Sequence, residues 1–372
     1  MLTKKKRVIF LGPVPPPYMG PTISTELILK SSLKNEFDLI HLDTSDHRDL
    51  NKLNKADIWN FLLAFKHYYL LILSIIKCDP ELVYIPICQT TLGYFRDAIF
   101  ILIAKIFNRK VISHLRGGNF RNWYLSSSPL VRWVVRQIHS LVDGQIVLGE
   151  NLKSLFRGIL TDEKLFVVPN GGNFHLNVKK GPFHEDEKVR ILFLSNLIKE
   201  KGIFDILSAV PEVISFTRNV EFIFAGEWQN HKTKEEYNRF MKENEGLPIR
   251  TFGPLSGKVK LDLLTSVDIF ILPTYYPPEG HPWVIVEAMA AGLPIITTDQ
   301  GAIKELVIDG INGFIIEKKS PQQIAEKIKF LISHPEMRNK MGQESRRLYL
   351  ENFTEEKMVE KLIFAFNSVL SR

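Results

Sequence analysis

Cysteine is scarce in this sequence, which has only Cys78 and Cys88 among its 372 residues. Two cysteines cannot form a disulfide framework or a zinc site made of cysteines alone, and their number fits a reducing compartment. The first residues do not resemble a signal peptide, because the basic run at residues 4–7 leads into a short apolar run without a small-residue cleavage site. We therefore expect a cytoplasmic protein.

The sequence also lacks a long uninterrupted apolar run. Residues 61–76 are interrupted by Lys66 and His67, and residues 95–107 by three charged side chains. A membrane-spanning helix needs about 18–20 predominantly apolar residues, and neither stretch reaches that length without a charge. We expect buried or interfacial helices at both places.

Acidic residues are in deficit at the front of the chain. The net charge is +7, but residues 1–180 hold 24 Lys and Arg against 14 Asp and Glu, which gives +10, whereas the remainder holds 24 against 27, which gives −3. A basic front half predicts phosphate-bearing partners or a peripheral contact with an anionic membrane, such as the inner face of the plasma membrane. A solvated basic face without a partner stays open, and no nucleic-acid-binding motif accompanies the charge.

Short apolar runs alternate with helical patterns along the whole chain. Expected strands lie at residues 7–11, 37–41, 82–87, 110–114, 144–148, 165–168, 189–195, 220–225, 249–252, 269–272, 295–298 and 314–316. Strands that alternate with helices predict a parallel sheet covered on both faces. The fold class is therefore α/β, with two doubly wound, Rossmann-like domains, and ligands should bind outside the carboxyl ends of the strands.

The polar stretch at residues 179–188 predicts a linker between the two domains. We place the first domain at residues 1–180 and the second at residues 181–354. A final helix over residues 355–370 follows Thr354, a suitable N-cap, and carries one apolar stripe. This helix is expected to complete the first domain.

One segment, EGHPWVIVEAMAAGLP at residues 279–294, carries the strongest chemical signal. It follows an expected strand, and a helix should begin near Pro282 and end at Gly292. Glu279 then lies just before the helix and Glu287 in its second turn. The free N–H groups of the first turn form an anion site between two carboxylates that could hold sugar hydroxyls.

This segment resembles the signature E-G-x-P-x-x-x-x-E-A-M-A-x-G-x-P of the retaining family-4 glycosyltransferases, which have the GT-B fold and are also known as glycosyl transferases group 1. The stretches GAIKEL at residues 301–306, DGING at residues 309–313, VVPNGG at residues 167–172 and NLIKEKG at residues 196–202 are similar to the same family. The resemblance is strong in the second half of the chain and looser in the first.

The resemblance implies how a nucleotide sugar is held. Glu287 is expected to bind the ribose hydroxyls and Glu279 the hydroxyls of the transferred sugar. The segment in contact with the diphosphate or the sugar comprises Gly280, His281, Pro282 and Trp283.

The resemblance further assigns Lys201 to the diphosphate leaving group, whose negative charge a fixed cation stabilises as the glycosidic bond breaks. Asn196 lies in the same phosphate-binding loop, and Gly20 of the first loop is expected to approach the donor. Two positions depart from the family pattern. Ser195-Asn196 stands where the family has Gly-Arg, and Gly20-Pro21 stands where it commonly has Gly-Gly, which removes one N–H donor.

A third departure lies in the first domain. The family often has a His-Gly pair near the transferred sugar, whereas this chain has Arg116 there, with His114 two residues earlier. Both should point to the same face of a strand, so either could serve in catalysis. Arg116 would stabilise anionic oxygens but could not act as a base. Residues 117–124 (GGNFRNWY) are expected to form a substrate-facing loop with aromatic platforms.

The resemblance implies a retaining glycosyltransferase that moves a sugar from a nucleotide-diphosphate donor to a saccharide or polyprenyl-linked acceptor, in bacterial envelope polysaccharide synthesis. No cofactor and no metal ion are expected, because the sequence has no Asp-x-Asp motif and cations with helix-terminal amides would replace the metal. Two alternatives stay open: a nucleotide-sugar epimerase of the same fold, and a catalytically silent protein that binds a nucleotide sugar. A nicotinamide dehydrogenase is disfavoured, because residues 12–20 lack G-x-G-x-x-G.

Overall fold

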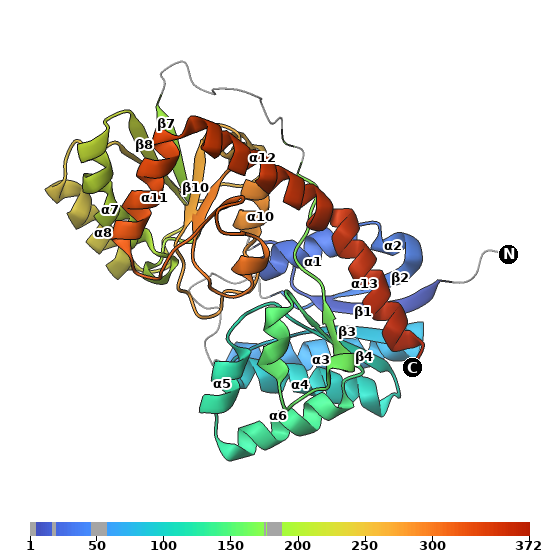
Figure 1. Cartoon of the computed structure of the whole chain (residues 1–372). Helices are drawn as coiled ribbons and strands as arrows, with labels where there is room; N and C mark the ends of the chain where they lie inside the picture. Colours follow the sequence, from blue (N-terminus) through green and yellow to red (C-terminus); the bar gives the residue numbers. More distant parts are fainter. Residues whose placement is uncertain (1–4, 17–19, 46–57, 175, 177–187) are drawn as a thin grey trace. The chain divides into compact units, whose positions relative to one another are not determined.

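The computed structural model describes residues 5–16, 20–45, 58–174, 176 and 188–372. The chain divides into two compact units (Figure 1). Unit 1 comprises Met1–Gly172 together with Glu355–Arg372, and unit 2 comprises Asn173–Thr354. The expected boundary at residues 180 and 181, and almost all of the expected linker, lie outside the described residues. Each unit is built around one parallel sheet, as the strand and helix alternation predicts.

The sheet of unit 1 has the strand order β2-β1-β3-β4-β5-β6, and every neighbouring pair is parallel. Its strands are nearly continuous apolar runs, which is typical of parallel sheets buried on both faces. Their bounds are β1 Lys6–Gly12, β2 Phe37–Asp43, β3 Leu82–Ile87, β4 Lys110–Leu115, β5 Gly144–Val147 and β6 Leu165–Val167.

Helices cover both faces of this sheet. Figure 1 shows α3, α4 and α6 on one side and α1, α2 and α13 on the other. The α-helical bounds in unit 1 are α1 Gly20–Lys30, α2 Leu33–Glu36, α3 Ile58–Cys78, α4 Thr91–Ile106, α5 Phe120–Ser126, α6 Pro129–Leu141 and α13 Glu355–Leu370, with short 3₁₀ turns at Asn151–Phe156 and Asp162–Lys164.

The C-terminal helix α13 packs on the sheet of unit 1, as predicted. Leu362, Ala365, Phe366 and Val369 are buried in one cluster with alternate residues of the central strands, of which Tyr84 is an example. Side chains alternate between the two faces of a strand, so the intervening residues face α3 and α4. The last 18 residues are therefore part of the core of unit 1, although they follow unit 2 in sequence.

The sheet of unit 2 has the order β12-β11-β10-β7-β8-β9, again with parallel neighbours. Its central strands β10 and β7 are buried along their whole length except for one partly exposed residue of β7. The strand bounds are β7 Val189–Leu194, β8 Val220–Ala225, β9 Ile249–Phe252, β10 Ile269–Leu272, β11 Ile295–Thr297 and β12 Gly313–Ile315.

The helices of unit 2 bury aliphatic side chains against this sheet in one core cluster. Their bounds are α7 Ile203–Phe216, α8 His231–Glu243, α9 Gly257–Leu264, α10 Trp283–Ala290, α11 Pro321–Ser333 and α12 Pro335–Asn352, with 3₁₀ turns η4 Lys199–Lys201 and η5 Ile303–Glu305. Every strand expected from the sequence coincides with an observed strand to within two residues, and the fold is the expected α/β arrangement of two doubly wound sheets.

Two expectations about unit 1 were wrong. Residues 117–124 do not form an open loop, because α5 begins at Phe120, and both Phe120 and Tyr124 are buried. The ring of Phe120 stacks on Phe156 at a centroid distance of 4.6 Å, so hydrophobic burial removes it from any substrate. Separately, α3 does contain a stretch long and apolar enough to cross a membrane, Trp59–Cys78, since its mean hydropathy is 1.6 in spite of Lys66 and Lys77.

Candidate donor-binding site

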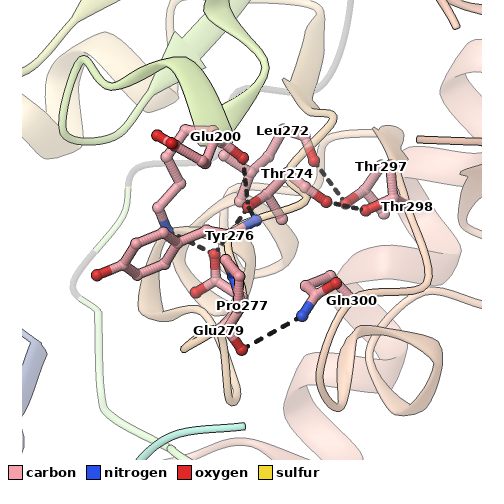
Figure 2. Close-up of polar contacts among 10 residues, drawn as sticks. Glu200, Leu272, Thr274, Tyr276, Pro277, Glu279, Thr297, Thr298 and Gln300 are labelled. Atoms are coloured by element: carbon pink, nitrogen blue, oxygen red, sulfur yellow. Dashed lines mark hydrogen bonds and ion pairs between the residues drawn. The ribbon is translucent and has the colours of Figure 1, made fainter. Parts of the chain in front are cut away.

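The loop that leaves β10 is held by hydroxyl groups of the next strand in the sheet. Thr297 Oγ1 donates a hydrogen bond of 2.7 Å to the carbonyl oxygen of Leu272, and Thr298 Oγ1 donates to that of Thr274 (Figure 2). Both threonines are fully buried. These bonds satisfy carbonyl groups at the last residue of β10 and in the loop after it, and they fix the path of the backbone toward Glu279.

Glu279 is bound on one side of its carboxylate only. Its Oε2 accepts hydrogen bonds from Lys201 Nζ at 2.5 Å and from Thr274 Oγ1 at 3.2 Å, and the side chain is 9% exposed. No described residue donates a hydrogen bond to Oε1. Glu279 therefore keeps a carboxylate oxygen for a hydroxyl donor of a ligand.

Lys201 lies at the end of η4, the turn that follows β7. Its ammonium group lies 5.1 Å from the centre of the Tyr276 ring, and its side chain is 12% exposed. The next residue, Gly202, has φ +85°, and a Cβ there would lie 2.5 Å from the carbonyl oxygen of Pro273. The glycine thus lets η4 pack directly on the β10 loop, which brings Lys201 to Glu279.

Gly301 packs directly against the backbone of Glu279 and Gly280. It has φ +62°, and a Cβ there would lie 2.4 Å from the carbonyl oxygen of Glu279 and 2.5 Å from that of Gly280. The N–H of Ala302 donates to the carbonyl oxygen of Gly280 at 2.7 Å. The GAIKEL stretch therefore supports the segment that precedes α10.

Helix α10 begins at Trp283 with Pro282 as its N-cap, and the αL residue Gly292 follows its last turn, as predicted. The carbonyl oxygen of Pro282 accepts the N–H of Ile285 at 3.1 Å. The first N–H groups of a helix have no intrahelical acceptor and favour an anion. His281 is buried, and its ring lies 5.4 Å from that of Phe353.

Glu287 is a buried carboxylate in the second turn of α10. Lys260 of α9 donates to its Oε1 at 2.5 Å, whereas no described residue donates a hydrogen bond to the buried Oε2. Burial raises the pKa of Glu287, and the charge of Lys260 opposes that effect. A buried acceptor without a donor costs free energy, and a ligand hydroxyl would recover it.

Asn196 lies in the loop after β7 and is exposed. The cation nearest to it in sequence, Lys199, pairs with Glu236 of α8 at 3.9 Å and is 60% exposed. Of the two lysines of NLIKEKG, only Lys201 is paired with Glu279. The position where the family has an arginine thus contributes a neutral side chain in this chain.

In unit 1, His114 of β4 and Arg116, which follows the end of β4, both contact the hydroxyl of Tyr84. Arg116 donates to Tyr84 Oη at 3.0 Å and to Thr25 Oγ1 at 3.1 Å, and it also donates to the carbonyl oxygen of Pro21. Helix α1 begins at Gly20. Arg116 therefore ties the start of α1 to the end of β4.

His114 is buried, and its Nδ1 lies 2.6 Å from Tyr84 Oη. Burial and the charge of Arg116 hold the pKa of His114 well below its usual range. A neutral imidazole accepts the Tyr84 hydroxyl at Nδ1 and carries its proton on Nε2, which is buried and has no hydrogen-bond partner in the described part of the chain. His114 is thus a neutral imidazole that could donate one hydrogen bond through Nε2. It does not carry the additional proton that a general acid would need.

The structure thus brings Glu279, Lys201, Gly280, His281 and Pro282 together with Trp283 and Glu287 in unit 2, and His114, Arg116 and Gly20 together in unit 1. Among the described residues, no group of three or more His, Cys, Asp or Glu side chains is arranged to hold a metal ion.

Sequence reasoning missed Lys260, Thr274 and Tyr276. Lys260 is 27 residues from its partner Glu287 and has no motif around it. Thr274 and Tyr276 stand in the loop beside the recognised segment, and their place directly after a buried strand was the available signal.

Comparison with known structures identifies the fold. The chain superposes on HepE from Anabaena, solved in complex with UDP, with a TM-score of 0.74 at 16% identity over 98% of this chain and 100% of HepE. It superposes on sucrose-phosphate synthase from Thermosynechococcus elongatus with a TM-score of 0.75 at 13% identity over 99% and 100% of the two chains. The protein has the GT-B fold.

The sequence of unit 2 is similar to a family of glycosyltransferases. Residues 176–348, which make up most of unit 2, match the model of glycosyl transferases group 1. Spore coat protein SA of Bacillus subtilis is 32% identical over 189 residues, which cover 47% of this chain and 48% of that protein. The capsular polysaccharide biosynthesis glycosyltransferase CapM of Staphylococcus aureus is 26% identical over 181 residues, 48% of this chain and 46% of CapM. The matches thus span about half the length of these relatives.

Proposed function

We propose that this protein is a retaining, metal-independent glycosyltransferase. It transfers a sugar from a nucleotide-diphosphate donor to a saccharide or lipid-linked saccharide of the bacterial envelope, and it acts in the cytoplasm. The observation that carries the proposal is the pairing of Lys201 with Glu279 at the edge of a buried helix N-terminus, within the segment that matches the family.

The Lys201–Glu279 pair supplies a cation that could exchange its carboxylate partner for the diphosphate of the donor. A donor diphosphate beside η4 would draw the ammonium group of Lys201, and the first amides of α10 would add partial positive charge. Glu279 would then accept hydroxyl groups of the sugar at Oε1, and Thr274 would hold its other oxygen. Negative charge grows on the diphosphate as the glycosidic bond breaks, so these contacts strengthen in the transition state.

Glu287 supports recognition of the nucleoside part of the donor. Its Oε2 is buried without a donor, and Lys260 fixes Oε1, so the free oxygen has one orientation. Paired ribose hydroxyls are a suitable ligand for such a carboxylate, because hydrogen bonds to a charged acceptor are strong. Structures similar in fold hold UDP or UDP-glucose, which favours a uridine diphosphate sugar as the first donor to test.

Retention and metal independence rest on chemistry that the residues can perform. The sequence contains no Asp-x-Asp motif, and a lysine with helix-terminal amides can balance the charge of a diphosphate. The leaving oxygen of the donor itself would take the proton of the incoming hydroxyl. The hydroxyl would then attack the face of the sugar that the leaving group departs from, so the anomeric configuration is retained. The acceptor class is supported by the name of the relative CapM, which acts in capsular polysaccharide biosynthesis.

The proposal is tested with a panel of uridine, guanosine and adenosine diphosphate sugars, with acceptors and with EDTA present. Nuclear magnetic resonance of the product reports the anomeric configuration. We expect Lys201→Gln to lower kcat by about 10²–10³-fold, as is typical when one electrostatic stabiliser is removed. The matched control Lys199→Gln, two residues away and paired with Glu236, should stay within about threefold of the parent.

Three outcomes contradict the proposal. Donor binding without turnover on any acceptor identifies a silent nucleotide-sugar-binding protein. An epimerised sugar nucleotide without transfer identifies an epimerase. An equal decrease of kcat in Lys201→Gln and Lys199→Gln would contradict the role proposed for the Lys201–Glu279 pair.

A further inference from the structure

The face of unit 1 formed by α3, α4 and α6 is unusually apolar for a surface. The stretch Trp59–Cys78 of α3 is only 17% buried over its most apolar window. Its exposed large side chains include Trp59, Phe61, Leu62, Phe65, Tyr69 and Ile76. At about 150–250 Å² for each aromatic side chain, the four aromatic residues alone leave on the order of 500 Å² in contact with solvent. Patches of this size on a soluble protein mark interaction sites.

The exposed residues follow the helical repeat on two neighbouring helices. On α3, Leu62, Phe65, Tyr69 and Ile76 are spaced i, i+3, i+7 and i+14, opposite the buried side of the helix. On α4, which packs beside α3, the exposed apolar residues Leu92, Ile99, Leu102 and Ile106 also follow the helical repeat, spaced i, i+7, i+10 and i+14. Helix α6 packs against α4 and adds Leu130 and Trp133.

Basic side chains accompany this apolar surface. Helices α3, α4 and α6 together hold six Lys and Arg against one Asp, a net charge of +5. Lys66 and Lys77 of α3 are exposed, Arg132 of α6 is partly exposed, and none of the three forms an ion pair with a described residue. Apolar and aromatic side chains flanked by unpaired cations are complementary to an anionic lipid surface.

We propose that the α3–α4–α6 face of unit 1 is a docking surface for a bilayer that contains anionic phospholipids. Trp59, Phe65 and Trp133 enter the headgroup region, where amphipathic aromatic rings are favoured. Lys66, Lys77 and Arg132 bind lipid phosphates, with their aliphatic stems along the apolar side chains.

Helix α3 lies on the bilayer and does not cross it. The strands before and after it, β2 and β3, both pair in parallel with β1 in one sheet. A spanning α3 would place these strands on opposite sides of the membrane and break that sheet. Its other side is also engaged, because His67, Leu71 and Ile75 are buried in unit 1.

A second copy of the chain is a poorer occupant of this face. Two such faces would bring the net charge of +5 on α3, α4 and α6 against an equal charge, and no described acidic residue pairs with Lys66, Lys77 or Arg132. The proposal does not depend on the transferase activity, since vesicle binding needs no donor sugar.

Co-sedimentation of the full chain with vesicles tests the surface. Vesicles of neutral phosphatidylcholine are compared with vesicles that also contain about 30% phosphatidylglycerol, at low and high salt. We expect binding to the anionic vesicles that falls at high salt. Phe65→Glu and Ile106→Glu, at sites 67% and 79% exposed, should each weaken it by about tenfold or more.

Phe364→Glu is the matched control, because Phe364 of α13 is 68% exposed on the opposite side of the same sheet. It should stay within about twofold of the parent. Circular dichroism confirms that each variant is folded. Absence of binding by the parent chain, or an equal loss in the Phe364 variant, overturns the proposal. Salt-independent binding to neutral vesicles, or sedimentation of a dimer that Phe65→Glu dissociates, also overturns it.

Discussion

The support that Gly301 gives to the donor segment predicts a large effect of one methyl group. In Gly301→Ala the new Cβ would lie 2.4 Å from the carbonyl oxygen of Glu279, whereas ordinary contact begins near 3.4 Å. The backbone must therefore move by about 1 Å. Gly310→Ala is the matched control, because Gly310 has φ +74° and no atom within 4 Å of its added Cβ.

The two variants share one cost and differ in the other. A left-handed conformation costs a residue with a Cβ about 1–2 kcal/mol, so both variants should lose about that much free energy of unfolding. Overpacking adds about 1–3 kcal/mol in Gly301→Ala only. We expect losses of about 1–2 kcal/mol in Gly310→Ala and about 2–5 kcal/mol in Gly301→Ala.

Activity separates the variants further. A displacement of about 1 Å in a positioning group can lower a rate by about 100-fold, so kcat/KM for the donor should fall by about that factor in Gly301→Ala and stay unchanged in Gly310→Ala. Urea unfolding and steady-state kinetics measure both quantities. Equal unfolding losses together with equal activity would show that the Gly301 contact does not position Glu279 and Gly280.

Two predictions concern pH. Donor binding should need the ionised form of Glu287, and burial raises the pKa of that carboxyl. As the solution is acidified, affinity for UDP, measured by calorimetry, should therefore begin to fall while the pH is still above 4.5. Glu287→Gln should bind UDP weakly at every pH and show no such fall. An equal fall in the variant would refute the assignment. In unit 1, burial lowers the pKa of His139 from 6.5 to about 4. The folded state favours the neutral imidazole, whereas the unfolded chain takes up a proton below pH 6.5. The free energy of unfolding is therefore highest above pH 6.5 and falls by about 3 kcal/mol as the pH is lowered to about 4. Urea unfolding of the parent at pH 7 and 4.5 should show a steeper loss than in His139→Gln, and parallel losses would contradict the prediction.

Some features were fixed by short-range sequence pattern. Strand positions followed from apolar runs bounded by Gly, Pro and polar residues, because burial on both faces of a parallel sheet requires such runs. The bounds of α10 followed from Pro282 and Gly292, since helix ends depend on local backbone geometry. The C-terminal helix over residues 355–370 could be predicted for the same reason.

Other features depend on pairs of residues distant in sequence. The bond between Lys201 and Glu279 joins residues 78 apart, and the bond between Lys260 of α9 and Glu287 of α10 joins residues 27 apart. The burial of Phe120 and the exposure of Phe65 could not be separated by composition, since both stand in aromatic, basic stretches. The sequence by itself determined which segment is the candidate for donor binding. Only the tertiary structure decided which oxygens are occupied and which apolar face is uncovered, because both depend on the partners that the sheet order brings together.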